Sequence, residues 1–374
     1  MGSEREKGSS RAPAAPRGQP AVAKIFYVRE ADMVRLLQAI GPDDVYATVR
    51  RPRGPAFCRL DKVPGAELAL RQPRPSSSPK AFLQPARERV AVYTLDGADE
   101  AESCPVCGRR ALVGVRACDL EAIRYLDKVF AEGECADPFY QSRRRSEVLV
   151  SVDCVAVHEN CFCTALGGRP FAEAGFDLNL TPITNGYLIE VGSDKGREII
   201  QKAGSAVTEA TDDQIAEREK ARRESADSLE KQNRGLKIPD KIQEILLVRQ
   251  KSGEGLEVCG ECVECAACTF ICPTCYCFYL YDQAVGGEKF ERLRTWDSCI
   301  LADYSRMAGP PGAKPTPRPR LRSRFVNRLL HKYAYGPQQF GYLGCVGCGR
   351  CIEACFGKID VREVLREIGR DASR

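Results

Sequence analysis

Residues 262–272 read CVECAACTFIC, and residues 345–355 read CVGCGRCIEAC. Both stretches have the spacing C-x2-C-x2-C-x3-C, which holds cubane iron–sulfur clusters in bacterial-type ferredoxins. The two-residue gaps let three thiolates curl around one cubane while backbone N–H groups face its sulfides. The fourth cysteine begins a helix and points away, so that it ligates the other cluster. The two stretches therefore predict a pair of [4Fe-4S] clusters in one ferredoxin-like domain.

This crossed arrangement gives each cluster its expected ligands. We expect Cys262, Cys265, Cys268 and Cys355 on the first cluster, and Cys345, Cys348, Cys351 and Cys272 on the second. Pro273 follows the first stretch as in ferredoxins, whereas Phe356 takes the matching place after the second, which loosens the turn but removes no ligand. Cys259 precedes the first stretch by another two-residue gap, so it is an extra thiol that could compete for a ligand position.

Zinc is the main alternative, because paired C-x2-C motifs also build zinc ribbons. Two matching quartets, the first followed by proline, favour iron–sulfur clusters. A zinc-stabilised nucleic-acid-binding module would also need a surface for phosphates. Lys314–Lys332 is strongly basic but lacks the interleaved aromatic residues of a single-strand-binding groove. We therefore predict that this stretch is a solvated or partner-facing surface, and we expect no nucleic-acid partner.

A second alternative is an iron–sulfur enzyme. Cys268, Cys272 and Cys275 match the three-cysteine pattern of radical enzymes that cleave S-adenosylmethionine. The ferredoxin spacing explains the same residues better, and no series of βα units that would form a barrel surrounds them. No G-x-G-x-x-G follows a strand and no phosphate loop is present, so neither a nicotinamide nor a flavin site is predicted. We expect no catalytic residue in this chain.

The composition of the chain agrees with metal binding inside the cell. The 374 residues include 20 cysteines but only two histidines, and they leave room for two or three domains. Because the cysteines are clustered and no apolar leader precedes them, a reducing compartment is expected and disulfides are not. No stretch approaches the roughly 18 apolar residues of a membrane span. We therefore predict a cytoplasmic protein without a membrane span.

The segment 111–154 predicts a second candidate site. Ala111–Val115 and Val148–Val152 are short apolar runs typical of buried parallel strands. A helix with Asp119 as its N-cap is expected between them, which gives a right-handed strand–helix–strand crossover. In such units, ligands gather beyond the carboxyl ends of the strands.

Cysteines follow the ends of both strands, and the topology would bring them to one face. They are Cys118, Cys154, Cys161 and Cys163. We interpret them as a candidate third iron–sulfur site, and the alternative of small buried residues stands equally beside it because free cysteine is often buried. For Cys275, Cys277 and Cys299, buried packing is favoured over a metal site. Cys104 and Cys107 resemble half of a zinc knuckle, and no second half is apparent.

The overall class predicted is α+β (mixed), with an N-terminal α/β domain and a C-terminal ferredoxin-like two-cluster domain. A run crowded with charged residues after Thr208 suggests a connector between the two. The predicted parts are a disordered N-terminus (1–22), an α/β domain with the possible extra cluster site (23–207), a charged helical connector (208–250) and a ferredoxin-like domain (251–374) with an insertion (273–344).

Several short motifs together resemble a known family, over roughly residues 79–365. It is the family of two-cluster iron–sulfur subunits that includes the beta subunit of sulfhydrogenase, together with the corresponding iron–sulfur subunit of anaerobic sulfite reductase. The motifs are Pro79-Lys80, GVRACD (114–119), DPFY (137–140), Arg143-Arg144, CFC (161–163), CPTC (272–275), WDSC (296–299), His331-Lys332 and CVGCGRC (345–351).

The resemblance implies a function and partners. Members of this family pass electrons between a subunit that binds flavin/NAD(P)H and a catalytic subunit of a hydrogenase or sulfite reductase, and the catalysis belongs to the assembled complex. The resemblance also supports the eight ferredoxin-type ligands. Phe356 and the pair Cys104–Cys107 depart from the pattern of the family.

Overall fold

The computed structural model describes residues 24–41, 44–63, 65, 67–94, 108–132, 135–252, 256–307, 309 and 316–371. The N-terminus predicted to be disordered (1–22) and the pair Cys104–Cys107 lie outside the described residues.

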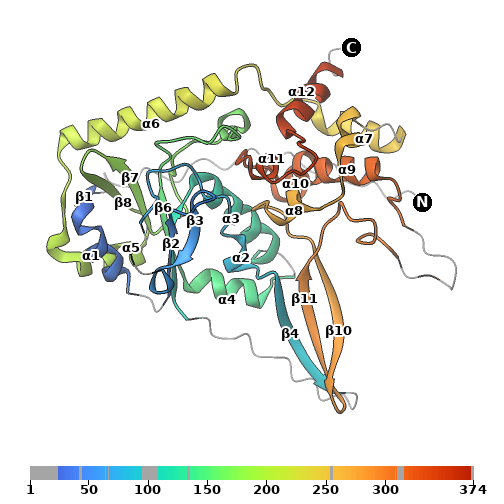
Figure 1. The fold of residues 1–374 in the computed structure, drawn as a ribbon, viewed down its shortest axis with the longest axis horizontal. Coiled ribbons are helices and arrows are strands. Elements are labelled where there is room, and N and C mark those ends of the chain that lie inside the picture. The colour runs from blue at the N-terminus through green and yellow to red at the C-terminus, as the bar shows by residue number, and fades with distance from the viewer. Residues whose placement is uncertain are drawn as a thin grey trace, which may run out of the picture.

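A large mixed sheet forms the N-terminal part of the described chain (Figure 1). Its eight strands lie in the order β3-β2-β5-β6-β7-β8-β1-β9. Neighbours from β2 through β5 and β6 to β7 are parallel, and all other pairs are antiparallel. The strands are β1 (Phe26–Arg29), β2 (Asp44–Val49), β3 (Ala56–Arg59), β5 (Arg110–Val115), β6 (Glu147–Val152), β7 (Leu178–Ile183), β8 (Gly186–Val191) and β9 (Val207–Glu209).

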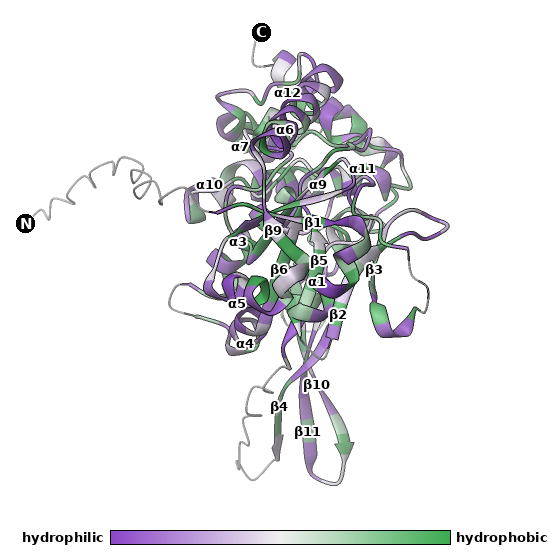
Figure 2. Ribbon diagram, turned by 90° about the vertical axis from the view of Figure 1, so that its left-hand side faces the viewer, coloured by the Kyte–Doolittle hydropathy of each residue, from purple (hydrophilic) through white to green (hydrophobic). Residues whose placement is uncertain are grey.

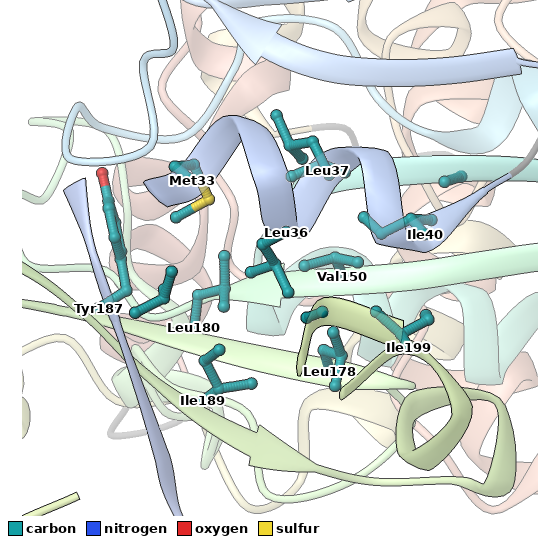
Figure 3. Packing of buried hydrophobic residues seen from close by; sticks show 14 of the residues in the cluster. Met33, Leu36, Leu37, Ile40, Val150, Leu178, Leu180, Tyr187, Ile189 and Ile199 are labelled. Carbon is teal, nitrogen blue, oxygen red and sulfur yellow. The ribbon is translucent and has the colours of Figure 1, made fainter. Parts of the chain in front are cut away.

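Helices cover both faces of this sheet, as the buried strands require. On one face lie α1 (Met33–Ile40) and α5 (Asp194–Ala203), and the other face carries α3 (Ala117–Phe130) and α4 (Pro138–Ser146). Figure 3 shows how Met33, Leu36, Leu37 and Ile40 of α1 pack over the strands. Their spacing of three and four residues places them on one side of the helix.

The predicted strand–helix–strand unit is confirmed, because β5 and β6 are parallel neighbours with Ala111 opposite Val148. The start of its helix was predicted wrongly. Arg116 is the N-cap, and Asp119 lies three residues further on, where its carboxylate accepts a hydrogen bond from the Arg116 backbone N–H at 3.3 Å. Arg116 has extended backbone angles, so the helix begins two residues before Asp119. A second helix, α4, completes the crossover.

A second sheet joins the two predicted domains. β4 (Arg87–Thr94), β10 (Phe278–Gly286) and β11 (Lys289–Trp296) form an antiparallel sheet in the order β10-β11-β4. It projects from the body of the molecule (Figures 1 and 2). Since β4 belongs to the predicted α/β domain while the other two strands belong to the predicted insertion, the two parts share one sheet.

The C-terminal part is helical. A long polar helix, α6 (Asp212–Gln232), packs against the sheet at β7 and leads to α7 (Ile242–Ser252). The helices α7, α9 (Leu321–Leu330) and α12 (Val361–Asp371) then enclose an apolar core around Leu246, Leu329 and Leu365. Shorter helical elements include α2 (Lys80–Leu83), α8 (Ala267–Phe270), α10 (Gly336–Phe340), α11 (Arg350–Glu353) and a π-helical turn (His331–Tyr335). None of the helices in the described part of the chain is both long and apolar enough to cross a membrane.

The basic stretch Lys314–Lys332 is not the solvated surface that its sequence predicts. The exposed fraction is only 2% for Arg324, 6% for Arg328 and 6% for Lys332. They are buried because α9 and the π-helical turn that follows it pack against α7, α12 and the cysteine loops, so that the last two turns of α9 and Lys332 face inward. Arg320 and Arg322 remain exposed. The prediction is therefore wrong for the second half of the stretch.

Candidate iron–sulfur sites

The first cysteine stretch curls around a hollow. Cys262, Cys265, Cys268 and Cys355 line this hollow, together with Cys351. The curl depends on left-handed backbone angles between the cysteines, with φ of 54° at Glu264 and 58° at Ala266. Cys355 comes from the end of the second stretch, so both stretches contribute to this site.

The second stretch surrounds a neighbouring hollow. Cys272, Cys345, Cys348 and Cys351 line it. Cys272 reaches it from the end of the first stretch, which mirrors the contribution of Cys355 to the first hollow. The two hollows share Cys351, Arg328 and Val361 as lining residues, so they lie next to each other.

Two buried cations face these thiols. Among the described residues, the Arg328 side chain has no hydrogen-bond or ion-pair partner, and its Nε is fully buried. Burial alone would lower the pKa of Arg328, but the nearby Cys268 and Cys351 thiols raise it overall. The Lys332 ammonium donates to Cys272 Sγ at 3.4 Å and to Thr274 Oγ1 at 2.6 Å.

Uncompensated buried charges are costly, so these cations call for an anionic group between the thiols. A [4Fe-4S] cluster with four thiolate ligands has a net negative charge, and the donor set therefore fits this group. Burial also raises the pKa of the Cys348 thiol to about 11 and that of Cys351 to about 12. Metal binding at these thiols is consequently coupled to proton release.

The cysteines of the N-terminal sheet also come together. Cys118, Cys154, Cys161 and Cys163 line a third hollow, which Cys348 of the second stretch borders as well. Across the described residues, no three His, Cys, Asp or Glu side chains are placed to share a single metal ion. This holds for the two ferredoxin-type sets as much as for the third. Each set surrounds a hollow instead of converging on one point.

Residues of the N-terminal part hold the second cysteine loop in place through buried hydrogen bonds and an ion pair. Arg350 donates to both carboxylate oxygens of Asp119, at 2.6 and 3.1 Å, and neither side chain is exposed. Arg74 donates to the carbonyl oxygen of Cys348. The Phe162 N–H donates to the carbonyl of Gly347 at 2.7 Å. The second loop is thus fixed by residues far from it in sequence.

An open cleft of about 480 Å³ lies beside these sites. Cys118 and Cys163 of the third set and Cys345 of the second stretch all line it. Arg124 of α3 stacks over the ring of Tyr342 at its edge, 4.2 Å from the ring centre. The cleft brings solvent to the boundary between the second and third thiol sets.

The remaining cysteines have separate places. Cys259 is buried in the apolar core of α7 and α12, and it is not among the described residues that line these hollows. Cys275 and Cys277 precede β10 and Cys299 follows β11, so the base of the projecting sheet gathers them. Lys80 donates to the Cys275 carbonyl at 3.2 Å, which fixes this base to α2.

Sequence reasoning missed the buried cations. The sequence predicts that Arg328 and Lys332 belong to a surface, and it indicates no role for Arg74 or Arg350. The available signal was a basic residue at three- or four-residue spacing among buried apolar residues of one helix (Arg324, Arg328, Lys332).

Two ferredoxin-type cysteine quartets, crossed in sequence, surround adjoining hollows. This arrangement is typical of two-cluster ferredoxin-type proteins. A family model described as a 4Fe-4S dicluster domain matches residues 261–359, and it implies two [4Fe-4S] clusters. The sulfhydrogenase 2 subunit beta of Pyrococcus furiosus is 32% identical over 328 residues, which are 87% of this chain and 92% of that protein. The chain belongs to the family of this sulfhydrogenase subunit, and it is an iron–sulfur electron-transfer protein. The resemblance found in the sequence is confirmed.

Proposed function

We propose that this chain is the electron-relay subunit of a cytoplasmic multi-subunit oxidoreductase of the hydrogenase or sulfite reductase type. It would pass single electrons between a subunit that binds flavin/NAD(P)H and a catalytic subunit. The observation that carries the proposal is the pair of adjoining thiol-lined hollows with Cys351 and Arg328 in common. The relationship to a sulfhydrogenase subunit supports the type of complex.

The proposed ligands follow the crossed arrangement. Cys262, Cys265, Cys268 and Cys355 would hold one cluster, and Cys345, Cys348, Cys351 and Cys272 the other. Such clusters, when bound, supply one-electron redox chemistry whose potential depends on charge, hydrogen bonds and solvent exposure. The chain itself provides thiolates, a largely dry interior and buried positive charge.

Arg328 and Lys332 set the charge of this interior. Since Arg328 lines both hollows, its guanidinium favours an added negative charge in either one. Lys332 lines the second hollow and not the first among the described residues, so its effect is specific to the second. Fixed charge of this kind is one of the protein's means of tuning a cluster.

The first site lies nearest to the surface and suits electron exchange with a partner. Cys265 is exposed, and Val263 and Phe356 beside it are 61% and 76% exposed. Phe356 occupies the place of the usual proline, directly after Cys355. An exposed aromatic residue next to a cluster ligand is a suitable anchor for a protein partner.

Anaerobic purification of the chain from its own cells tests the proposal. We expect a flavin-containing subunit to co-purify, and about eight irons per chain to be bound at the two ferredoxin-type sites. In the complex, Cys348→Ser should remove one cluster's EPR signal and stop electron flow, whereas Cys58→Ser on β3 should change neither. Full activity and unchanged spectra in the Cys348 variant, or an active protein that purifies alone, would refute the proposed role.

A further inference from the structure

The third hollow arises from the topology of the sheet. Cys118 lies in the first turn of α3, directly after β5, and Cys154 lies two residues beyond the end of β6. Cys161 and Cys163 follow in the next loop. Because β5 and β6 are parallel neighbours, all four residues gather at the carboxyl ends of the strands, where open α/β sheets bind ligands.

The hollow has the size of the neighbouring ferredoxin-type site. A sphere the size of a water molecule can enter about 20 Å³ of space in each of the two hollows. Four thiols line the second hollow, and the third hollow has four thiols of its own besides the shared Cys348. The third set is thus equipped with the same number and type of donors, in a space of similar size, as a site assigned to a [4Fe-4S] cluster.

Buried positive charge accompanies this hollow too. Arg116 is fully buried, and it donates to the backbone carbonyls of Val152 and Asp153 at the end of β6. Among the described residues, its side chain has only backbone carbonyls as partners. Its Nε has no partner. Arg74, with a side chain 1% exposed, lines the hollow directly, and its guanidinium is paired with the Glu353 carboxylate at 3.0 Å. A bound anionic group would compensate the charge of Arg116, which is otherwise expensive to bury.

The hollow also lies directly against the second ferredoxin-type site. Cys348 lines both, and the Cys161 thiol donates to the Cys348 carbonyl at 3.8 Å. A Cβ atom on Gly347 would lie 2.5 Å from Cys163 Cα. The two loops are therefore in contact along their backbones.

We propose that Cys118, Cys154, Cys161 and Cys163 hold a third iron–sulfur cluster, adjacent to the second ferredoxin-type site. This inference rests on the proposed function, because it extends the same relay into the N-terminal sheet. It also gives the relay a second outlet, since Cys118 and Cys163 line the open cleft of about 480 Å³.

The test is a count of iron, acid-labile sulfide and zinc in the full chain purified without oxygen. We expect about twelve irons per chain and no stoichiometric zinc. The double variant Cys154→Ser/Cys161→Ser should retain about eight irons and lose one set of EPR signals. The matched control Cys58→Ser, a cysteine of the same sheet outside the hollow, should keep about twelve.

Two results would overturn the third cluster. One is about eight irons in the unmodified chain, with the same count in the double variant. The other is about eight irons with one zinc, the zinc being lost in the double variant. If the double variant fails to fold, the count in the unmodified chain still decides between eight and twelve. A chain with zinc and no iron would instead overturn the proposed function as a whole.

Discussion

The two ferredoxin-type loops have the same cysteine spacing but opposite surroundings. The first loop borders solvent through Cys265 and Val263, while Cys348 of the second is buried under the N-terminal part. The backbone makes the same turns in both, because Glu264 and Gly347 occupy equivalent places and have φ of 54° and 64°. The spacing therefore determines how each loop curls, and contacts outside the motif determine what the loop can exchange electrons with.

The largest expected difference concerns the ion pair that fixes only the second loop. Asp119→Asn leaves Arg350 buried without its counter-charge, and such a change costs about 3–5 kcal/mol. We expect a strongly lowered unfolding temperature and loss of the second cluster. As a control, Asp282→Asn removes an exposed pair with Arg292 and should cost less than about 1 kcal/mol. Equal unfolding temperatures for the two variants would show that Asp119 does not anchor the loop.

A smaller effect is expected at Gly347, where the second cysteine loop contacts the loop that carries Cys163. Gly347→Ala places a methyl group 2.5 Å from Cys163 Cα, and overpacking of this kind costs about 1–3 kcal/mol. Left-handed backbone adds about 1–2 kcal/mol. Gly341→Ala is the matched control, since it has φ of 75° but no atom within 4 Å of the new methyl group. Denaturant unfolding should separate the two variants, and a cost at Gly347 no greater than at Gly341 would contradict the close approach.

Some of these features could be predicted from the sequence, and others could not. The cysteine spacing predicted the two loops, and the apolar runs predicted β5, β6 and the cysteines at their ends. The burial of Arg328 and Lys332 was harder to predict. Their helical spacing is a signal, but a basic residue is normally solvated, and only the packing of the helical segment reverses this. The pairing of β4 with β11 could not be predicted either, because it brings together residues from distant parts of the chain, such as Arg87 and Thr295.

The buried cations should separate the two sites electrochemically. Arg328→Gln removes a charge that lines both hollows and should shift both cluster potentials to more negative values. Lys332→Gln should shift mainly the second. A shift on the order of 50 mV corresponds to about 1 kcal/mol for a one-electron couple. Redox titration followed by EPR measures it, with the exposed Arg322→Gln on the same helix as control. If Arg328→Gln and Lys332→Gln shifted the two cluster potentials in the same way, the proposal that Arg328 alone acts on both sites would be refuted.

The smallest expected effect lies at the exposed first loop. Phe356→Asp should leave iron content and unfolding temperature unchanged, because the side chain is 76% exposed. Loss of an aromatic anchor costs about 1–2 kcal/mol of binding, so the affinity for the electron-transfer partner should fall roughly tenfold. Tyr279→Asp on the projecting β10, also an exposed aromatic residue, is the control for a general effect of charge. Equal losses at both positions would remove the special role of the first loop.

Two clusters in adjoining sites of one relay should interact magnetically. The most direct measurement is EPR of the fully reduced chain, purified without oxygen, beside Cys265→Ser and Cys348→Ser. With the third thiol set removed from all three proteins by Cys154→Ser/Cys161→Ser, we predict broadened signals from two interacting clusters in the parent chain. Each of the two variants should then give the spectrum of one isolated cluster. A spectrum equal to the sum of two independent clusters, or an EPR-silent chain that contains zinc, would rule out two interacting clusters in adjoining sites.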